Sequence, residues 1–198
     1  MLSLAHQIAV ALAGIYLVAV VYSWQAIKYV LKPTVTLLIA YPTFNRPYSK
    51  ISAGLLCSTL GDIFLMAPSQ SMFIPGLLSF LAAHVLYIAS FEAPLRLSWT
   101  AAPLAAFAAS MACILWPGVT KEGIEVQLGV VVYILAITTM AFKATLTNVP
   151  MLVCGTLLFC ISDAVLAYAK FIRLFAWSEF VVMLTYYMAQ LCIAIVHS

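Results

Sequence analysis

The sequence predicts an all-α membrane protein, a polytopic bundle of about eight transmembrane helices in one integral membrane domain over residues 1–198. Hydrophobic residues make up 66% of the chain and charged residues only 8%, whereas soluble domains average about 25% charged residues. The apolar runs are long and continuous, which favours helices over a membrane β-barrel. A helical span needs about 20 apolar residues, so this length allows seven or eight spans with short connections. The net charge of +3 is small and scattered, and we expect no nucleic-acid partner.

Apolar runs bounded by prolines and polar residues place the first four spans. The first has no basic segment before it that would indicate a cleavable signal. The second is short, and we expect Pro33 in its first turn, where the missing N–H would be unpaired anyway. The third carries Asp62 and the fourth carries His84. These spans are expected at residues 4–24, 29–41, 49–67 and 72–91.

The second half of the chain predicts four further spans. The fifth has no charged residue, so we expect it to be lipid-facing scaffold. Pro150 starts the seventh span, which carries Asp163, and the eighth holds Tyr186, Tyr187 and Gln190. These spans are expected at residues 99–116, 126–142, 150–169 and 174–196.

Two aspartates lie in runs that are otherwise fit for lipid. Asp62 and Asp163 each follow a small residue and precede a leucine by three positions. A carboxylate near the bilayer centre costs about 2.5–3.5 kcal/mol on insertion scales, so it usually faces a protein interior and serves a function. Each lies about 20 Å into its span, and both spans run in the same direction. We expect the two carboxylates at one depth, and close together if their helices are neighbours; the ordinary alternative is a structural hydrogen bond between helices.

Other polar side chains reach this depth from neighbouring spans. His84 and Tyr87 are three residues apart, which places them on one helix face. Tyr186 and Tyr187 are adjacent and point to different faces, so at most one reaches the carboxylates. A structural histidine, packing tyrosines and a glutamine that joins two helices are the ordinary alternatives. The predicted pocket consists of Lys32, Asp62, His84, Tyr87, Asp163, Tyr186, Tyr187 and Gln190.

Several common chemistries lack their sequence signals. The chain contains no GxSxG, no HExxH and no glycine-rich phosphate loop. Its three histidines are far apart, and its five cysteines lie in apolar runs without metal-ligand spacing. We therefore predict no metal and no cofactor.

Five short motifs resemble those of the YhhN/TMEM86 family, in the same order and spacing. The motifs are KPT at 32–34, GDIFLM at 61–66, AHVLY at 83–87, SDAVLA at 162–167 with KF at 170–171, and TYYMAQ at 185–190. The resemblance implies eight membrane helices and lysoplasmalogenase activity without a metal. Such an enzyme hydrolyses the vinyl ether bond of a lysophospholipid drawn from the bilayer. Its products are a fatty aldehyde and glycerophosphoethanolamine or glycerophosphocholine.

Vinyl ethers are labile to acid, and two carboxylates suit that chemistry. One would protonate the substrate and the other would stabilise the cation, as in glycosidases. We favour Asp62 as the acid, with His84 or a tyrosine positioning water and Lys32 holding the phosphate. The competing hypothesis is a proton-coupled transporter or channel, since intramembrane Asp, His and Tyr sets also form proton relays. The compact chain favours a bacterial cytoplasmic membrane over an endoplasmic reticulum.

Overall fold

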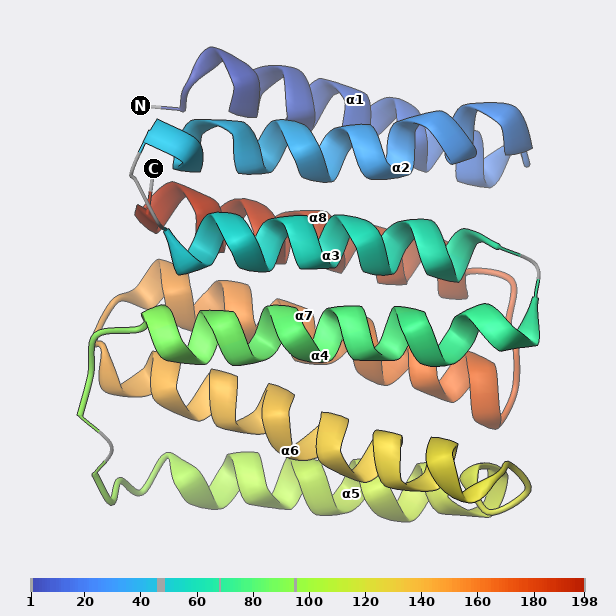
Figure 1. Ribbon diagram of the computed structural model, residues 1–198, viewed down its shortest axis with the longest axis vertical. Coiled ribbons are helices and arrows are strands. Elements are labelled where there is room, and N and C mark those ends of the chain that lie inside the picture. Colours follow the sequence, from blue (N-terminus) through green and yellow to red (C-terminus); the bar gives the residue numbers. More distant parts are fainter. Residues whose placement is uncertain (1, 46–48, 68, 95, 198) are drawn as a thin grey trace.

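A computed structural model describes residues 2–45, 49–67, 69–94 and 96–197, which form an all-helical bundle (Figure 1). Two short 3-10 helices, Tyr41–Asn45 and Gln70–Met72, lie in the connections. The described residues form eight α-helices, which confirms the predicted fold class. Their bounds are α1 Leu4–Val21, α2 Gln25–Ala40, α3 Lys50–Met66, α4 Phe73–Ser90, α5 Ala101–Val119, α6 Ile124–Leu146, α7 Pro150–Phe171 and α8 Ser178–His197.

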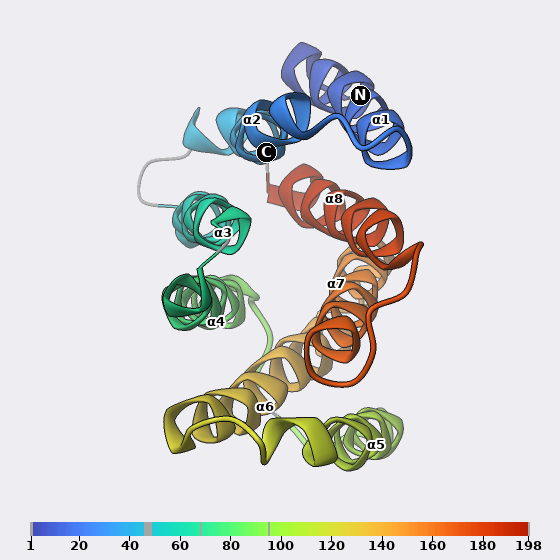
Figure 2. The same cartoon turned by 90° about the vertical axis from the view of Figure 1, so that its right-hand side faces the viewer.

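Seven of the helices form a closed ring, and α5 lies outside it. Each of α1, α2, α3 and α4 packs on the next, α4 packs on α6, and the ring closes through α7 and α8 back to α1. Helix α5 packs on the outside of α6 and α7. The end-on view shows α3 and α7 on opposite sides of the ring (Figure 2). The two aspartate-bearing helices therefore face each other across the interior.

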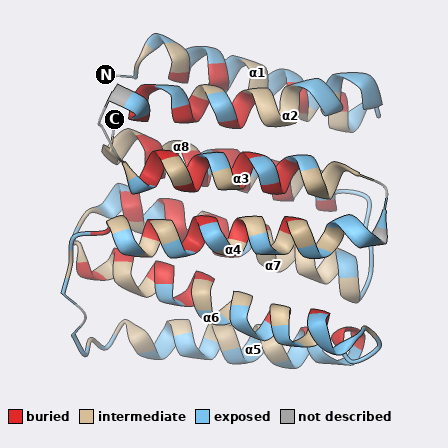
Figure 3. Cartoon of the chain, in the orientation of Figure 1, coloured by how far each residue is buried: buried red, intermediate tan, exposed pale blue. Residues whose placement is uncertain are grey.

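The outer surface of the bundle is apolar, as an integral membrane protein requires. Six of the helices in the described residues are long and apolar enough to cross a membrane, while α2 and α3 have 16 and 17 residues. Large side chains such as Leu128 and Leu135 are 60% exposed. Buried residues line the inward faces of the ring (Figure 3), and among them are polar ones such as Asp62 and His84. Lipid therefore surrounds an apolar wall, and the polar side chains that matter are inside.

The prediction for the second span was wrong at its start. Helix α2 begins at Gln25, so Pro33 lies in the helix interior and not in the first turn. The polar residues Gln25 and Lys28 concealed the first turn in the sequence. Proline is tolerated inside membrane helices where hydroxyls and neighbouring helices supply polar support. Here the Thr34 hydroxyl donates to the Val30 carbonyl one turn earlier, at 2.7 Å.

Candidate active site

Asp62 is buried on α3, accepts hydrogen bonds from two hydroxyls on other helices and forms an ion pair with a lysine. The Tyr186 hydroxyl on α8 donates to Oδ2 at 2.8 Å, and the Thr36 hydroxyl on α2 donates to the same oxygen at 3.0 Å. The Lys32 ammonium lies 3.6 Å from Oδ1. Lys32 and Thr36 are four residues apart and so share one face of α2. Two hydroxyls and an ammonium together fit an ionised carboxylate.

A glycine beside Asp62 lets α4 approach α3 closely. A Cβ atom built on Gly61 would lie 2.6 Å from the Phe80 ring on α4. The same Phe80 ring packs edge-on against Tyr186, with ring centroids 5.9 Å apart. Gly61 therefore leaves room for the Phe80 ring, which packs against Tyr186, a hydrogen-bond donor to Asp62.

Asp163 on α7 has a different and less polar environment. The Tyr133 hydroxyl on α6 donates to Oδ2 at 2.5 Å, and Nε2 of His84 lies 4.0 Å from the same oxygen. The His84 ring is fully buried between the rings of Tyr133 and Phe159, with centroid distances of 5.0 and 4.8 Å. Among the described residues, neither His84 ring nitrogen has a hydrogen-bond partner. No lysine contacts Asp163 within that part of the chain.

Two cavities meet at Asp163. The polar cavity, of about 310 Å³, carries charged side chains among apolar ones, and its lining includes both aspartates, Lys32 and Tyr186. The apolar cavity, of about 240 Å³, has a mostly apolar lining and lies between α3, α4, α5, α6 and α7. Asp163 lines both cavities. Three apolar residues do the same: Leu65, Phe80 and Leu166. Asp163 therefore lies in the wall between a cavity with charged side chains and a mostly apolar one.

Three predicted site residues form no hydrogen bond with either aspartate among the described residues. The Tyr87 hydroxyl donates to Oε1 of Gln190 at 2.8 Å, and Ser58 Oγ lies 3.4 Å from that hydroxyl. The Tyr187 ring packs edge-on against Tyr16, at 5.6 Å between centroids. Ser58, Tyr87 and Gln190 thus link α3, α4 and α8. Tyr187 links α8 to α1. Only one of the two adjacent tyrosines, Tyr186, contacts an aspartate through a hydrogen bond among the described residues.

Sequence reasoning missed two hydrogen-bond donors, Thr36 to Asp62 and Tyr133 to Asp163. Thr36 lies one turn after Lys32, so the spacing of the KPT motif could have indicated it. Tyr133 stands alone in an apolar stretch of α6, and that isolation was its only signal. The packing of α6 on α7 brings it to Asp163. The contact of α4 with α6 brings the same ring to His84, and no sequence pattern indicates that second contact.

The comparison with protein-family models places this arrangement among known proteins. The YhhN family model matches residues 26–196, which include every predicted site residue. The chain belongs to the YhhN family. It is 33% identical over 167 residues to lysoplasmalogenase TMEM86A of Bos taurus, covering 80% of this chain and 67% of the relative. The match to lysoplasmalogenase TMEM86B of Sus scrofa is 32% over 148 residues, covering 74% of this chain and 62% of the relative.

A human relative gives the same result. Lysoplasmalogenase TMEM86A of Homo sapiens is 32% identical over 170 residues, which cover 80% of this chain and 67% of the relative. The chain thus spans about two thirds of the length of these curated relatives. No solved structure matches the chain.

Proposed function

We propose that this YhhN-family protein is a lysoplasmalogenase, which hydrolyses the vinyl ether bond of a lysophospholipid taken from the bilayer. The observation that carries the proposal is the position of Asp163 at the junction of a polar and an apolar cavity. A lysoplasmalogen has its vinyl ether at the corresponding junction, between an alkenyl chain and a polar glycerophosphate. The names of the relatives support the same activity.

In this proposal the alkenyl chain lies in the apolar cavity between α3, α4, α5, α6 and α7. The glycerophosphate lies in the polar cavity, where Lys32 is available to its phosphate. Phe80 and Leu65 line both cavities and would flank the vinyl ether. Both ends of the substrate are then held, so the reacting carbon has a fixed position beside a carboxyl group.

The proposed chemistry begins with proton transfer to the β-carbon of the vinyl ether, which leaves an oxocarbenium ion. Water adds to the carbon of that ion and loses a proton, giving a hemiacetal. The hemiacetal collapses to a fatty aldehyde and releases glycerophosphoethanolamine or glycerophosphocholine as the alcohol. This reaction therefore needs a proton donor, a negative charge near the cation and a base for the water.

The surroundings of the two aspartates favour Asp163 as the proton donor and Asp62 as the carboxylate that stabilises the cation. Asp62 accepts from two hydroxyls and has an ammonium nearby, which is the environment of a charged group. Asp163 lies at the apolar cavity with a hydroxyl and a buried imidazole as its polar neighbours. This assignment reverses the one that the sequence favoured. Two carboxylates with unlike environments and unlike roles are familiar from glycosidases.

His84 is a candidate to position the water or to pass its proton. Its imidazole is buried, lies 4.0 Å from Asp163 and has no hydrogen-bond partner on either nitrogen among the described residues. A buried polar ring without partners is unfavourable unless water or substrate provides them. Tyr87, Tyr187 and Gln190 have supporting roles in this proposal, because their contacts lie away from the two carboxylates.

The continuous helices favour an enzyme over a transporter. Transporters commonly bind their ions and substrates at discontinuous helices. Here α3 and α7 run without interruption through Asp62 and Asp163. The carboxylates therefore sit on rigid elements, as catalysis requires.

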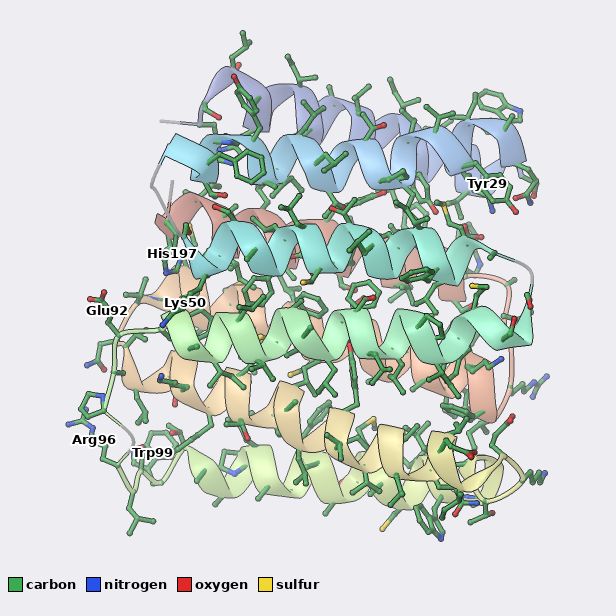
Figure 4. All side chains as sticks on the ribbon, viewed as in Figure 1. Tyr29, Lys50, Glu92, Arg96, Trp99 and His197 are labelled. Atoms are coloured by element: carbon green, nitrogen blue, oxygen red, sulfur yellow. The ribbon has the colours of Figure 1, made fainter. Side chains whose placement is uncertain are left out.

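The test is aldehyde release from a lysoplasmalogen by purified protein in detergent, where no gradient can drive transport. Asp62→Asn and Asp163→Asn should each lower turnover by at least about 100-fold. Glu92→Gln, at an exposed loop at the far end of the bundle (Figure 4), should leave turnover unchanged. Absence of aldehyde from the wild type would refute the proposal. Near-normal turnover in Asp163→Asn would remove that residue as the acid.

The proton transfer to carbon can also be followed directly. Reaction in D₂O should place one deuterium on the aldehyde carbon next to the carbonyl, because protonation there forms the oxocarbenium ion. Rapid reduction of the aldehyde to the alcohol would preserve that label for mass spectrometry. An unlabelled carbon would exclude this first step.

A further inference from the structure

An ion pair lies where the polar cavity reaches the surface. Nζ of Lys28, in the first turn of α2, is 2.9 Å from both carboxylate oxygens of Glu179, in the first turn of α8. The Tyr16 hydroxyl on α1 donates to the same carboxylate at 3.2 Å. The Glu179 side chain is 47% exposed and that of Lys28 is 13% exposed. The chemistry proposed above uses neither residue, yet both line the cavity that holds the aspartates.

Two lysines lie between two carboxylates along this cavity, from the interior to the surface. Asp62 is deepest and pairs with Lys32, whose side chain is 15% exposed. Lys28 lies four residues before Lys32, on the same face of α2 and nearer the start of the helix. Glu179 is the outermost of the four. Figure 4 marks this end of the bundle by Tyr29, which lines the same cavity.

We propose that Lys28 and Glu179 recognise the head group of the lysolipid, and that they select a zwitterionic one. The phosphodiester lies between the ammonium groups of Lys28 and Lys32, and the terminal ammonium of the lipid lies against Glu179. This inference rests on the proposed function and names residues that determine its specificity. On binding, the lipid phosphate replaces Glu179 as the partner of Lys28, and the lipid ammonium replaces Lys28 as the partner of Glu179. No charge is then left unpaired, which avoids the penalty of an isolated partly buried ion.

An anionic head group fits this receptor less well. Phosphatidylglycerol-type lipids have the same phosphodiester but end in a neutral glycerol. Their phosphate would engage Lys28, and Glu179 would then face hydroxyls in place of a cation. Its carboxylate would lose a charged partner while lying near a second negative charge.

The test is a binding competition that involves no turnover. Purified full-length protein in detergent is mixed with equal amounts of saturated lysophosphatidylethanolamine and lysophosphatidylglycerol of one chain length. Native mass spectrometry then gives the ratio of the two complexes. Because neither lipid has a vinyl ether, the ratio reports head-group recognition alone. We expect the wild type to prefer the ethanolamine lipid about five-fold, the size of a partly exposed charge pair.

Glu179→Gln should bring that ratio close to one, because glutamine keeps the shape and the Tyr16 contact but loses the charge. Glu92→Gln is the matched control and should keep the wild-type ratio. Lys28→Gln combined with Glu179→Gln removes both charges together, so it leaves no unpaired ion that could unfold the bundle. The double variant should bind both lipids more weakly and without preference.

A wild-type ratio near one, or an unchanged ratio in Glu179→Gln, would overturn the inference and identify the ion pair as a structural link between α2 and α8. The outcome is separate from that of the aldehyde assay. Head-group preference without aldehyde release would refute the proposed activity and leave the receptor in place. Aldehyde release without the preference would support the proposed activity and overturn the inference about Lys28 and Glu179.

Discussion

Tyr133 is the residue whose hydroxyl donates to Asp163, at 2.5 Å. Tyr133→Phe keeps the ring that packs on His84 and removes the hydrogen bond that orients the carboxyl group. We expect kcat for aldehyde release to fall by about ten-fold or more, since small misplacements of a catalytic group have effects of that order. Tyr22→Phe, at an exposed ring stacked on Trp24, should retain the wild-type rate. A normal kcat in Tyr133→Phe would mean that Asp163 needs no such orientation.

Thr36 provides a second prediction at the scale of one residue. Thr36→Val is nearly isosteric and removes one of the hydroxyls that donate to the buried Asp62. A hydrogen bond to a charged group contributes about 1.5–3 kcal/mol, so its loss should lower the thermal midpoint, and turnover should fall with it. Thr34→Val is the matched control, because that hydroxyl donates to a backbone carbonyl and contacts no aspartate among the described residues. Equal thermal midpoints for the two variants would show that Asp62 does not depend on Thr36.

At the scale of the helix, Gly61 permits the close packing of α3 on α4. Gly61→Ala would place a methyl group 2.6 Å from the Phe80 ring, which would have to move away from Tyr186. We expect a loss of about 1–3 kcal/mol in stability and a lower kcat. Gly14→Ala is the control, because a Cβ there meets nothing within 4 Å. If both variants unfold at the same temperature, α3 and α4 can separate without strain.

Helix periodicity explains which parts of the site the sequence predicts. Spacing along one helix gives depth and face. The depth of Asp62 and Asp163 therefore follows from residue counts, and so does the expectation that at most one of Tyr186 and Tyr187 reaches a carboxylate. The same spacing does not say which helices are neighbours. The contact of α4 with α6 joins residues far apart in the chain, and it brings Tyr133 to His84 beside Asp163. Pro33 was misplaced for a related reason, since polar residues in the first turn of α2 look like a connection when only hydropathy is considered.

The arrangement of the whole molecule gives α5 a function that its sequence did not suggest. This helix lies outside the ring and was expected to be scaffold only, yet Phe107, Met111 and Leu115 line the apolar cavity. These side chains form the part of the cavity wall that the ring helices do not supply. Because α5 covers this side, a lipid chain in the cavity would have protein around it where the vinyl ether reacts. Exclusion of water there would protect the oxocarbenium ion until the positioned water adds.

Chain-length selectivity tests this role of α5. Met111→Trp should fill the part of the cavity that α5 closes, so the protein should accept short chains and reject long ones. We expect kcat/KM for a hexadecenyl lysoplasmalogen to fall about ten-fold, and that for an octenyl analogue to change little, since overpacking acts only where the chain reaches. Ile114→Trp is the control, because Ile114 is 44% exposed on the same helix and does not line the cavity. Equal losses for both chain lengths in Met111→Trp would place the alkenyl chain elsewhere and leave α5 as scaffold.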